Sequence, residues 1–171
     1  MGEINIITGG IGQGKTTFCR RLVAATTQKG WVVKGVLSLP VFEDGRKIGI
    51  DLLDVSSGEK RRLAHRDRPT SGPRTPGWHF LASALAWGDE ILNRAVPCDL
   101  LVIDELGPLE LLRNEGWQAG IDALNSGAYQ IAVVVVRPSL LTTTLATWPQ
   151  AAVVELAAPE QAAKLVGDIL P

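Results

Sequence analysis

The chain has 171 residues, which is enough for one domain with its own hydrophobic core and short for two domains of ordinary size. Apolar residues make up 46% of it and charged residues 20%, a composition that excludes a disordered chain, a fibre and a coiled coil. The 17 Lys and Arg residues nearly balance the 18 Asp and Glu residues, which argues against a dedicated binder of duplex DNA. We therefore expect one domain over residues 1–171, without nucleic acid as a partner.

The cysteine content and the hydropathy of the sequence indicate the cellular compartment in which the protein is expected. Cys19 and Cys98 stand far apart, and only two histidines accompany them, so the sequence predicts neither a zinc site nor a disulfide framework. The longest strongly apolar run, residues 131–136, is far shorter than the ~20 residues that a membrane helix needs. We expect a cytoplasmic protein with reduced cysteines and no membrane partner. The oligomeric state stays open, and a monomer is compatible with the sequence.

The chain begins with a pattern of strand, glycine-rich loop and helix. Residues 3–8 are rich in isoleucine and predict a short buried strand that runs directly into a glycine cluster. Apolar side chains at helical spacing predict a helix over residues 15–29, with Gly30 as its C-terminal stop.

A meander of strands is predicted next. Residues 31–41 and 47–55 alternate in part, and Asp44-Gly45 between them is a strong hairpin signal. A third strand is expected around residues 61–65. Residues 66–77 contain three prolines, two glycines and no large apolar residue, which predicts a mobile surface loop.

Helices and strands alternate in the remaining sequence. Such alternation favours an α/β fold with a mostly parallel sheet flanked by helices, to which the meander adds an antiparallel hairpin extension. The expected elements are helices over residues 80–95, 115–125 and 160–169, and buried strands over residues 99–103, 131–136 and 152–156.

Residues 9–16, GGIGQGKT, fit the phosphate-loop pattern G-x-x-x-x-G-K-[ST] between the first strand and the first helix. Glycines allow positive φ angles and let main-chain N–H groups close around phosphate oxygens. Lys15 is expected to reach the β- and γ-phosphates, and the Thr16 hydroxyl to face Mg²⁺. A plain glycine-rich turn is the alternative, and Lys15-Thr16 weighs against it. Thr17 either touches the α-phosphate or only begins the helix. The predicted nucleotide-binding residues are Gly9, Gly10, Ile11, Gly12, Gln13, Gly14, Lys15, Thr16 and Thr17.

An acidic pair ends the apolar segment at residues 99–105, DLLVIDE. Asp104 is predicted to hold Mg²⁺ together with Thr16, through a water, and Glu105 to act as general base or to position the attacking water. The alternative, two polar residues that open a loop, loses weight beside a complete phosphate loop. Glu110 has three interpretations: support of the Mg²⁺ shell, a pair with an arginine, or a plain surface acid.

Basic and aromatic residues give weaker signals. Arg137, at the end of a predicted strand, is placed either to reach phosphate or base or only to form a salt bridge. Trp148 is the tryptophan best placed to stack on a base, although core packing is the stronger expectation for every tryptophan. The residues of a basic segment are candidates for an arginine finger, a solvated loop or a surface for an acidic partner or nucleic acid. They are Lys60, Arg61, Arg62, Arg66, Arg68 and Arg74.

The order of GGIGQGKTT, GVLSLPVFEDGRKIGIDLLD and VIDELGPLEL resembles the cancer-related nucleoside-triphosphatase family, small P-loop proteins of bacteria, archaea and animals. The resemblance spans residues 4–137, and its most specific part is residues 104–110, similar to the family's Asp-Glu-Ile-Gly-Pro-Met-Glu. The sequence departs from the family at Ile11, near which the family often has a proline, and over residues 137–171. These departures bear on base specificity and on any lid.

The resemblance implies a P-loop α/β fold and slow, Mg²⁺-dependent hydrolysis of ATP, GTP and other nucleoside triphosphates to diphosphate and phosphate. By matching positions it implies that Lys15 and Thr16 contact phosphate and Mg²⁺, that Asp104 is the Mg²⁺ partner and that Glu105 is the base. Lys15 and Glu105 are thus the predicted catalytic residues, and Thr16 and Asp104 the predicted metal ligands.

Two other functions use the same motifs. A small-molecule or nucleotide kinase replaces the attacking water by an acceptor hydroxyl, and it needs an acceptor pocket and a lid, for which residues 66–77 are a candidate. A nucleotide-binding switch or adaptor instead uses the triphosphate to order the basic segment, and a partner reads that order.

Overall fold

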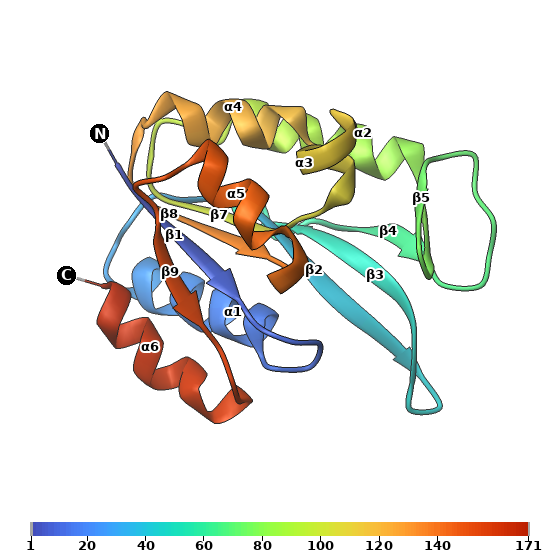
Figure 1. The fold of residues 1–171 in the computed structure, drawn as a ribbon, viewed down its shortest axis with the longest axis horizontal. Helices are drawn as coiled ribbons and strands as arrows, with labels where there is room; N and C mark the ends of the chain where they lie inside the picture. Colours follow the sequence, from blue (N-terminus) through green and yellow to red (C-terminus); the bar gives the residue numbers. More distant parts are fainter. Residues whose placement is uncertain (1, 171) are drawn as a thin grey trace.

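The computed structural model describes residues 2–170, and in this part of the chain helices cover both faces of one nine-stranded sheet (Figure 1). Across the sheet the strands are β5 (Arg74–Thr75), β6 (Trp78–Phe80), β4 (Lys60–His65), β3 (Arg46–Asp54), β2 (Val33–Glu43), β7 (Cys98–Leu106), β8 (Tyr129–Val136), β1 (Glu3–Thr8) and β9 (Ala152–Glu155). The helices are α1 (Lys15–Gln28), α2 (Ala82–Asn93), α3 (Pro108–Arg113), α4 (Gln118–Ser126), α5 (Leu141–Thr147) and α6 (Ala162–Ile169), with 3₁₀ turns η1 (Pro138–Leu140) and η2 (Pro159–Gln161).

The sheet has a parallel half and an antiparallel half that meet at β2. Strands β2, β7, β8, β1 and β9 run parallel, whereas β3, β4, β6 and β5 continue the sheet from β2 in antiparallel pairs. The predicted α/β class is confirmed. The antiparallel extension is larger than a hairpin, because it also contains the short strands β5 and β6, which the sequence analysis did not predict.

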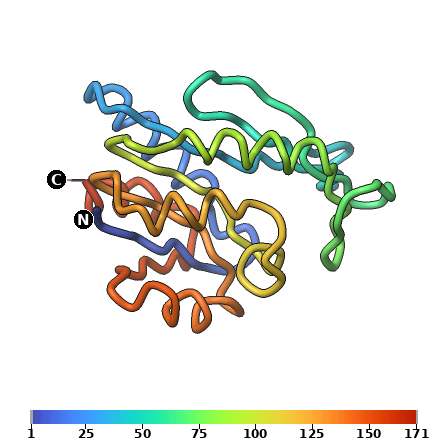
Figure 2. Tube along the Cα trace, turned by 90° about the horizontal axis from the view of Figure 1, so that it is seen from above, coloured from blue at the N-terminus to red at the C-terminus, as the bar shows by residue number. Residues whose placement is uncertain are grey.

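Strand alternation divides the core into two layers. Ile6 and Val134 point to the face covered by α2, α4 and α5, and their neighbours Ile7 and Val133 point to the face covered by α1 and α6. Figure 2 shows α2 and α4 side by side along the first face. Parallel strands that are buried on both faces require continuous apolar segments, and β7 and β8 each contain such a segment.

Three predicted elements are wrong in part. The helix expected over residues 80–95 begins only at Ala82, because residues 78–80 form β6. The helix expected over residues 115–125 begins only at Gln118, as α4, because Gly116 takes a φ of 65°, and α3 lies before the predicted range.

The loop expected over residues 66–77 is tied to β6. The Thr70 hydroxyl donates to the carbonyl of Phe80, the Phe80 N–H donates to Pro73 O at 2.9 Å, and residues 74–75 form β5. This segment is therefore anchored to the antiparallel extension. Within residues 2–170 no helix has the length and apolar character needed to cross a membrane.

Candidate active site

Three parallel strands bring the predicted site residues to one edge of the sheet. The phosphate loop follows β1, the acidic pair lies at the end of β7, and Arg137 follows β8, which lies between β1 and β7. Since carboxyl ends of parallel strands meet at the same edge, these segments converge although they are far apart in the sequence.

Backbone geometry explains the glycines of the phosphate loop. Gly9, Gly12 and Gly14 have φ angles of 150°, 75° and 89°, where other residues are disfavoured. A Cβ at Gly9 would also lie 2.4 Å from Leu156 O, and one at Gly14 would lie 2.9 Å from Pro159 Cα. The loop thus needs glycine both for its own conformation and for its contact with the segment after β9.

Lys15 begins α1 and folds back over the loop. Its Nζ donates to Gly9 O and to Gly10 O, each at 2.7 Å. Burial lowers the pKa of Lys15, while the nearby carboxylates of Glu105 and Asp104 act in the opposite direction. The ammonium group, the free N–H groups of the first helical turn and the helix dipole together make this end of α1 suitable for an anion.

Asp104 is a buried carboxylate held by hydrogen bonds. Its side chain is 2% exposed, its Oδ2 accepts the N–H of Ser38 at 3.1 Å, and the Thr16 hydroxyl also bonds to it. Burial raises the pKa of Asp104 to about 7, against the effect of these hydrogen bonds. Among the ion pairs of residues 2–170, none involves Asp104.

This donor set fits a divalent metal ion. A buried carboxylate without a cationic partner beside a hydroxyl offers the hard oxygen ligands that Mg²⁺ prefers. Residues 2–170 contain no group of three His, Cys, Asp or Glu side chains placed to hold a metal. Mg²⁺ commonly uses few protein ligands and completes its shell with phosphate oxygens and water, so the pair of Thr16 and Asp104 is compatible with such a site.

Glu105 lies in a distorted part of β7. The register between β7 and β8 shifts between Ile103 and Leu106, and Glu105 takes a φ of 90° there. Such a conformation costs a residue with a Cβ roughly 1–3 kcal/mol, and it occurs preferentially at functional sites. The Glu105 carboxylate forms an ion pair with the Arg137 guanidinium, which links the ends of β7 and β8.

Comparison with known proteins agrees with this geometry. A family model described as NTPase matches residues 5–170. This chain belongs to that family.

Curated relatives carry the name nucleoside-triphosphatase THEP1. The protein of Methanopyrus kandleri is 33% identical over 124 residues, covering 72% of this chain and 66% of the relative. That of Caldivirga maquilingensis is 33% identical over 129 residues, with 75% and 73% covered. That of Thermococcus kodakarensis is 34% identical over 136 residues, again with 75% and 73% covered.

Two solved structures share the fold. The solution structure of a human cancer-related nucleoside triphosphatase matches with a TM-score of 0.72 at 23% identity, covering 99% of this chain and 95% of that chain. The crystal structure of THEP1 from Aquifex aeolicus matches with a TM-score of 0.66 at 19% identity, covering 98% and 96%. The predicted family resemblance and the P-loop α/β fold are thereby confirmed.

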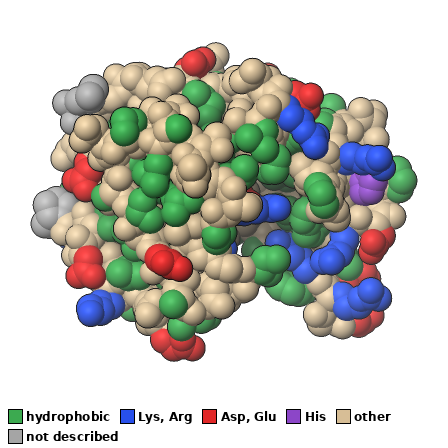
Figure 3. All heavy atoms as spheres, viewed as in Figure 1, with side chains coloured by type: hydrophobic (Ala, Val, Ile, Leu, Met, Phe, Trp, Pro, Cys, Tyr) green, Lys and Arg blue, Asp and Glu red, His purple; other side chains and the backbone are tan. Residues whose placement is uncertain are grey.

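The structure of this NTPase family member adds two residues that sequence reasoning missed. Ser38 on β2 binds Asp104, and Lys47 on β3 carries an ammonium group 4.9 Å from the centroid of the Trp78 ring. Burial lowers the pKa of Lys47, and the carboxylates of Glu105 and Asp104 oppose this shift, which places Lys47 in the field of the acidic pair. Figure 3 shows Lys and Arg side chains gathered around a hollow on this face.

Two candidates of the sequence lie outside the site. Glu110 is 7% exposed and accepts the N–H groups of Gly107 at 2.9 Å and Trp117 at 3.0 Å, so it is neither a surface acid nor the partner of an arginine. It stabilises the loops on both sides of α3. Trp148 is buried in the core and donates to Asn125 Oδ1 at 2.9 Å, which contradicts stacking on a base.

Three basic residues are engaged on the antiparallel extension. Arg61 pairs with Glu59 and lies over Trp87, at 4.3 Å from the ring centroid, while Arg62 pairs with Asp51 at 2.6 Å. These contacts hold the two side chains on β4, where they serve the extension. Arg66 lies 5.8 Å from the Trp78 ring centroid, on the same indole as Lys47.

Proposed function

We propose that this family member hydrolyses nucleoside triphosphates, ATP and GTP among them, to nucleoside diphosphate and phosphate in a Mg²⁺-dependent reaction. One observation carries the proposal: a buried Asp104 without an ion-pair partner lies beside Thr16 and within electrostatic range of Lys15, and Glu105 follows it near the end of β7. These are the charges that a triphosphate and its metal require.

Binding is assigned to residues 9–17. The carbonyls of Gly9 and Gly10 hold the Lys15 ammonium, and phosphate oxygens replace them as its partners when the triphosphate binds. Main-chain N–H groups of the loop and of the first turn of α1 take the remaining phosphate oxygens. Ile11, fully exposed at the tip of the loop, contributes its main chain only.

Thr16 and Asp104 are the residues that would hold Mg²⁺. When bound, the ion neutralises charge that develops on the phosphate oxygens. Ser38 positions Asp104 through its N–H, so the carboxylate is oriented before any ligand arrives. Lys47, which lies in the field of the acidic pair, adds a second positive charge for the triphosphate.

Glu105 is assigned the role of general base, which accepts a proton from the attacking water. A carboxylate within hydrogen-bond reach of that water accepts its proton as the water oxygen bonds to the γ-phosphorus. In this structure Arg137 pairs with this carboxylate. A γ-phosphate competes for the guanidinium, and the transfer of Arg137 from Glu105 to phosphate leaves Glu105 available as base.

The remaining assignments complete the proposal. The chain acts as one domain, which is supported by two core layers that pack on a single sheet. The free thiols of Cys19 and Cys98 support a reducing, cytoplasmic setting. The nucleoside triphosphate is the partner we assign, and the near-neutral charge of the chain disfavours nucleic acid.

The test is release of phosphate from ATP and GTP in the presence and absence of Mg²⁺. Lys15→Ala and Glu105→Gln should each lower kcat/KM by about 100-fold or more, because each removes an interaction with the reacting phosphate or water. Lys164→Ala and Glu90→Gln are matched controls at exposed positions. Activity that survives both site changes contradicts the mechanism. Tight nucleotide binding without turnover favours the switch or adaptor.

A further inference from the structure

A cavity lies beside the acidic pair, with Glu105 among the residues that line it. We call it the aromatic pocket, after Trp78, Phe80 and Trp117, which line it together with Leu63 and Thr75. The centre of a water-sized sphere can occupy about 50 Å³ of it, within an opening of about 500 Å³ that includes open solvent, and no residue of the phosphate loop lines it. The pocket is therefore separate from the place proposed for the triphosphate tail.

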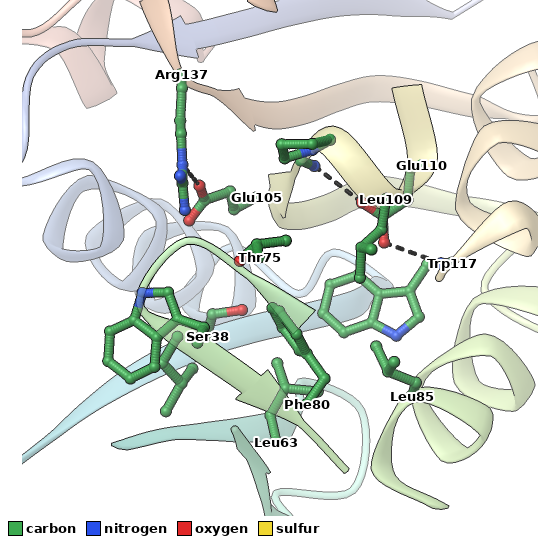
Figure 4. A pocket seen from close by; sticks show the side chains of 14 residues that line it. Ser38, Leu63, Thr75, Phe80, Leu85, Glu105, Leu109, Glu110, Trp117 and Arg137 are labelled. Atoms are coloured by element: carbon green, nitrogen blue, oxygen red, sulfur yellow. Dashed lines mark hydrogen bonds and ion pairs between the residues drawn. The ribbon is translucent and has the colours of Figure 1, made fainter. Parts of the chain in front are cut away.

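The aromatic pocket and the proposed reaction centre share three residues, namely Glu105, Arg137 and Ser38, which binds Asp104. Glu105 and Arg137 lie at one end of the pocket, and Figure 4 shows Thr75 between Glu105 and Phe80. A molecule seated against the aromatic walls thus has one end at the carboxylate that we assign as base. That end occupies the place from which an attacking group approaches the γ-phosphate.

One residue that lines the pocket, Thr75, carries a buried hydroxyl without a hydrogen-bond partner, and the residue is 8% exposed. Trp117 Nε1 also has no partner, but it lies against Gly88 of α2, so Trp117 lines the pocket with another part of its indole. Buried hydroxyl groups normally have partners. A polar group beside mainly apolar walls is typical of a ligand site, where a few polar groups fix the orientation of an apolar body.

We propose that the aromatic pocket binds a small hydroxyl compound with an aromatic or alicyclic body, and that its hydroxyl accepts the γ-phosphoryl group. This inference rests on the proposed function, because it uses the same triphosphate and the same base. The hydroxyl oxygen bonds to the γ-phosphorus, and the bond from that phosphorus to the β,γ-bridging oxygen breaks. The electron pair stays on the nucleoside diphosphate, and the hydroxyl proton passes to Glu105 and then to solvent. The products are a phosphate monoester and the diphosphate.

The chemistry of the pocket favours a hydroxyl acceptor over a phosphate acceptor. A phosphate acceptor is already ionised and needs no base, and apolar walls do not compensate its charge. A hydroxyl needs a base at the reacting end and tolerates an apolar environment along its body. Glu105 at the mouth and Phe80 and Trp117 along the walls supply both conditions.

The experiment follows the labelled phosphoryl group from γ-labelled ATP with Mg²⁺. The probes are 2-phenylethanol, cyclohexanemethanol and 3-indoleethanol, and ethylbenzene is the matched probe without a hydroxyl. We expect a labelled phosphate ester that saturates with at least one of the alcohols, and release of free phosphate that falls as the ester forms. Ethylbenzene should yield no ester. Glu105→Gln should abolish ester formation.

Thr75→Val tests the pocket itself, because it removes the unpartnered hydroxyl at nearly constant volume. The alcohol concentration for half-saturation should rise about fivefold, the value of one neutral hydrogen bond. Thr142→Val, at an exposed position on α5, is the control. Absence of ester with all three alcohols overturns the inference. Phosphate release without any alcohol is measured separately and reports on the proposed hydrolysis alone.

Discussion

Ser38 and Asp104 are joined twice, once through the side chain of each residue. The Ser38 N–H donates to Asp104 Oδ2 at 3.1 Å, and the Ser38 hydroxyl donates to Asp104 O at 2.8 Å. Strand β2 therefore fixes both the carboxylate and the peptide group that precedes the strained Glu105. The register of β2 against β7, in which Val36 lies opposite Ile103, determines this arrangement.

The first prediction concerns the dependence of stability on pH. Burial raises the pKa of Asp104 to about 7, whereas an unfolded Asp has a pKa of about 3.9. Between these values the folded metal-free protein holds a proton that the unfolded chain has released. The stabilisation is complete below pH ~4 and is lost as the pH rises through about 7, so Asp104→Asn should raise Tm at pH 8.

Thermal unfolding in EDTA at pH 5 and pH 8 measures this effect. For a protein of this size, 1 kcal/mol corresponds to roughly 2–4 °C in Tm. Burial also raises the pKa of Glu110, and the comparison of variant with wild type cancels that contribution. Asp122→Asn, at an exposed position of α4, is the control. A lower Tm for Asp104→Asn than for wild type at pH 8 contradicts the prediction.

The second prediction concerns the close approach of β2 to β7. Gly35 has a φ of 122°, and a Cβ there would lie 1.9 Å from Val102 O. Gly35→Ala should lower the free energy of unfolding by about 3 kcal/mol or more, from backbone strain and overlap together. Gly45→Ala is the control, because its φ of 75° gives strain without any atom near the Cβ. The free energy of unfolding is measured in urea. If Gly35→Ala and Gly45→Ala lower it equally, the overlap of the new Cβ with Val102 O has no energetic cost and the prediction is wrong.

The third prediction separates Glu110 from the reaction. Both carboxylate oxygens accept buried main-chain N–H groups, those of Gly107 and Trp117. Glu110→Gln turns an amide NH₂ toward one of these donors, and the lost bond should cost about 1–3 kcal/mol. The exposed Glu115→Gln is the control. The free energy of unfolding in urea and kcat should be measured together. A lower kcat without a lower free energy of unfolding would contradict a purely structural role and show that Glu110 takes part in the reaction.

The fourth prediction concerns Lys47. Its ammonium lies in the field of Glu105 and Asp104, where a triphosphate adds further negative charge. Lys47→Met should lower kcat/KM by about tenfold or more, equivalent to ~1.4 kcal/mol of lost stabilisation. Lys34→Met is the matched control, because Lys34 Nζ donates to Arg94 O, away from the acidic pair. An unchanged kcat/KM, at low and at high salt, would remove Lys47 from the proposed site.

The sequence predicted those parts of the site that are local. The phosphate loop and the pair Asp104-Glu105 are continuous segments whose residue types follow from the chemistry of phosphate and metal. Ser38, Lys47 and Thr75 had no such signal. The alternation of apolar and polar residues along a strand predicts which of its faces is buried. Which residues that face contacts depends on the pairing of strands that are distant in the sequence.

Other misses have equally physical reasons. Strand β6 has three residues, too few for a period of two to be recognised. The helix expected to begin at residue 115 begins at Gln118, because Gly116 has a positive φ that no helical turn contains. Glu110 has the residue type of a metal ligand, and only its burial between two loops shows that its partners are main-chain N–H groups.

The insertion of β8 between β1 and β7 has a consequence for biosynthesis. Ile4 pairs with Ala132, and Leu101 pairs with the same residue from the other side. A nascent chain in which β8 has not yet been synthesised already contains the phosphate loop and the acidic pair. No strand then lies between β1 and β7 to hold these two motifs next to each other. We therefore expect the emerging polypeptide to stay inert toward nucleotides until its central strand leaves the ribosome, so that catalytic competence arrives late and all at once.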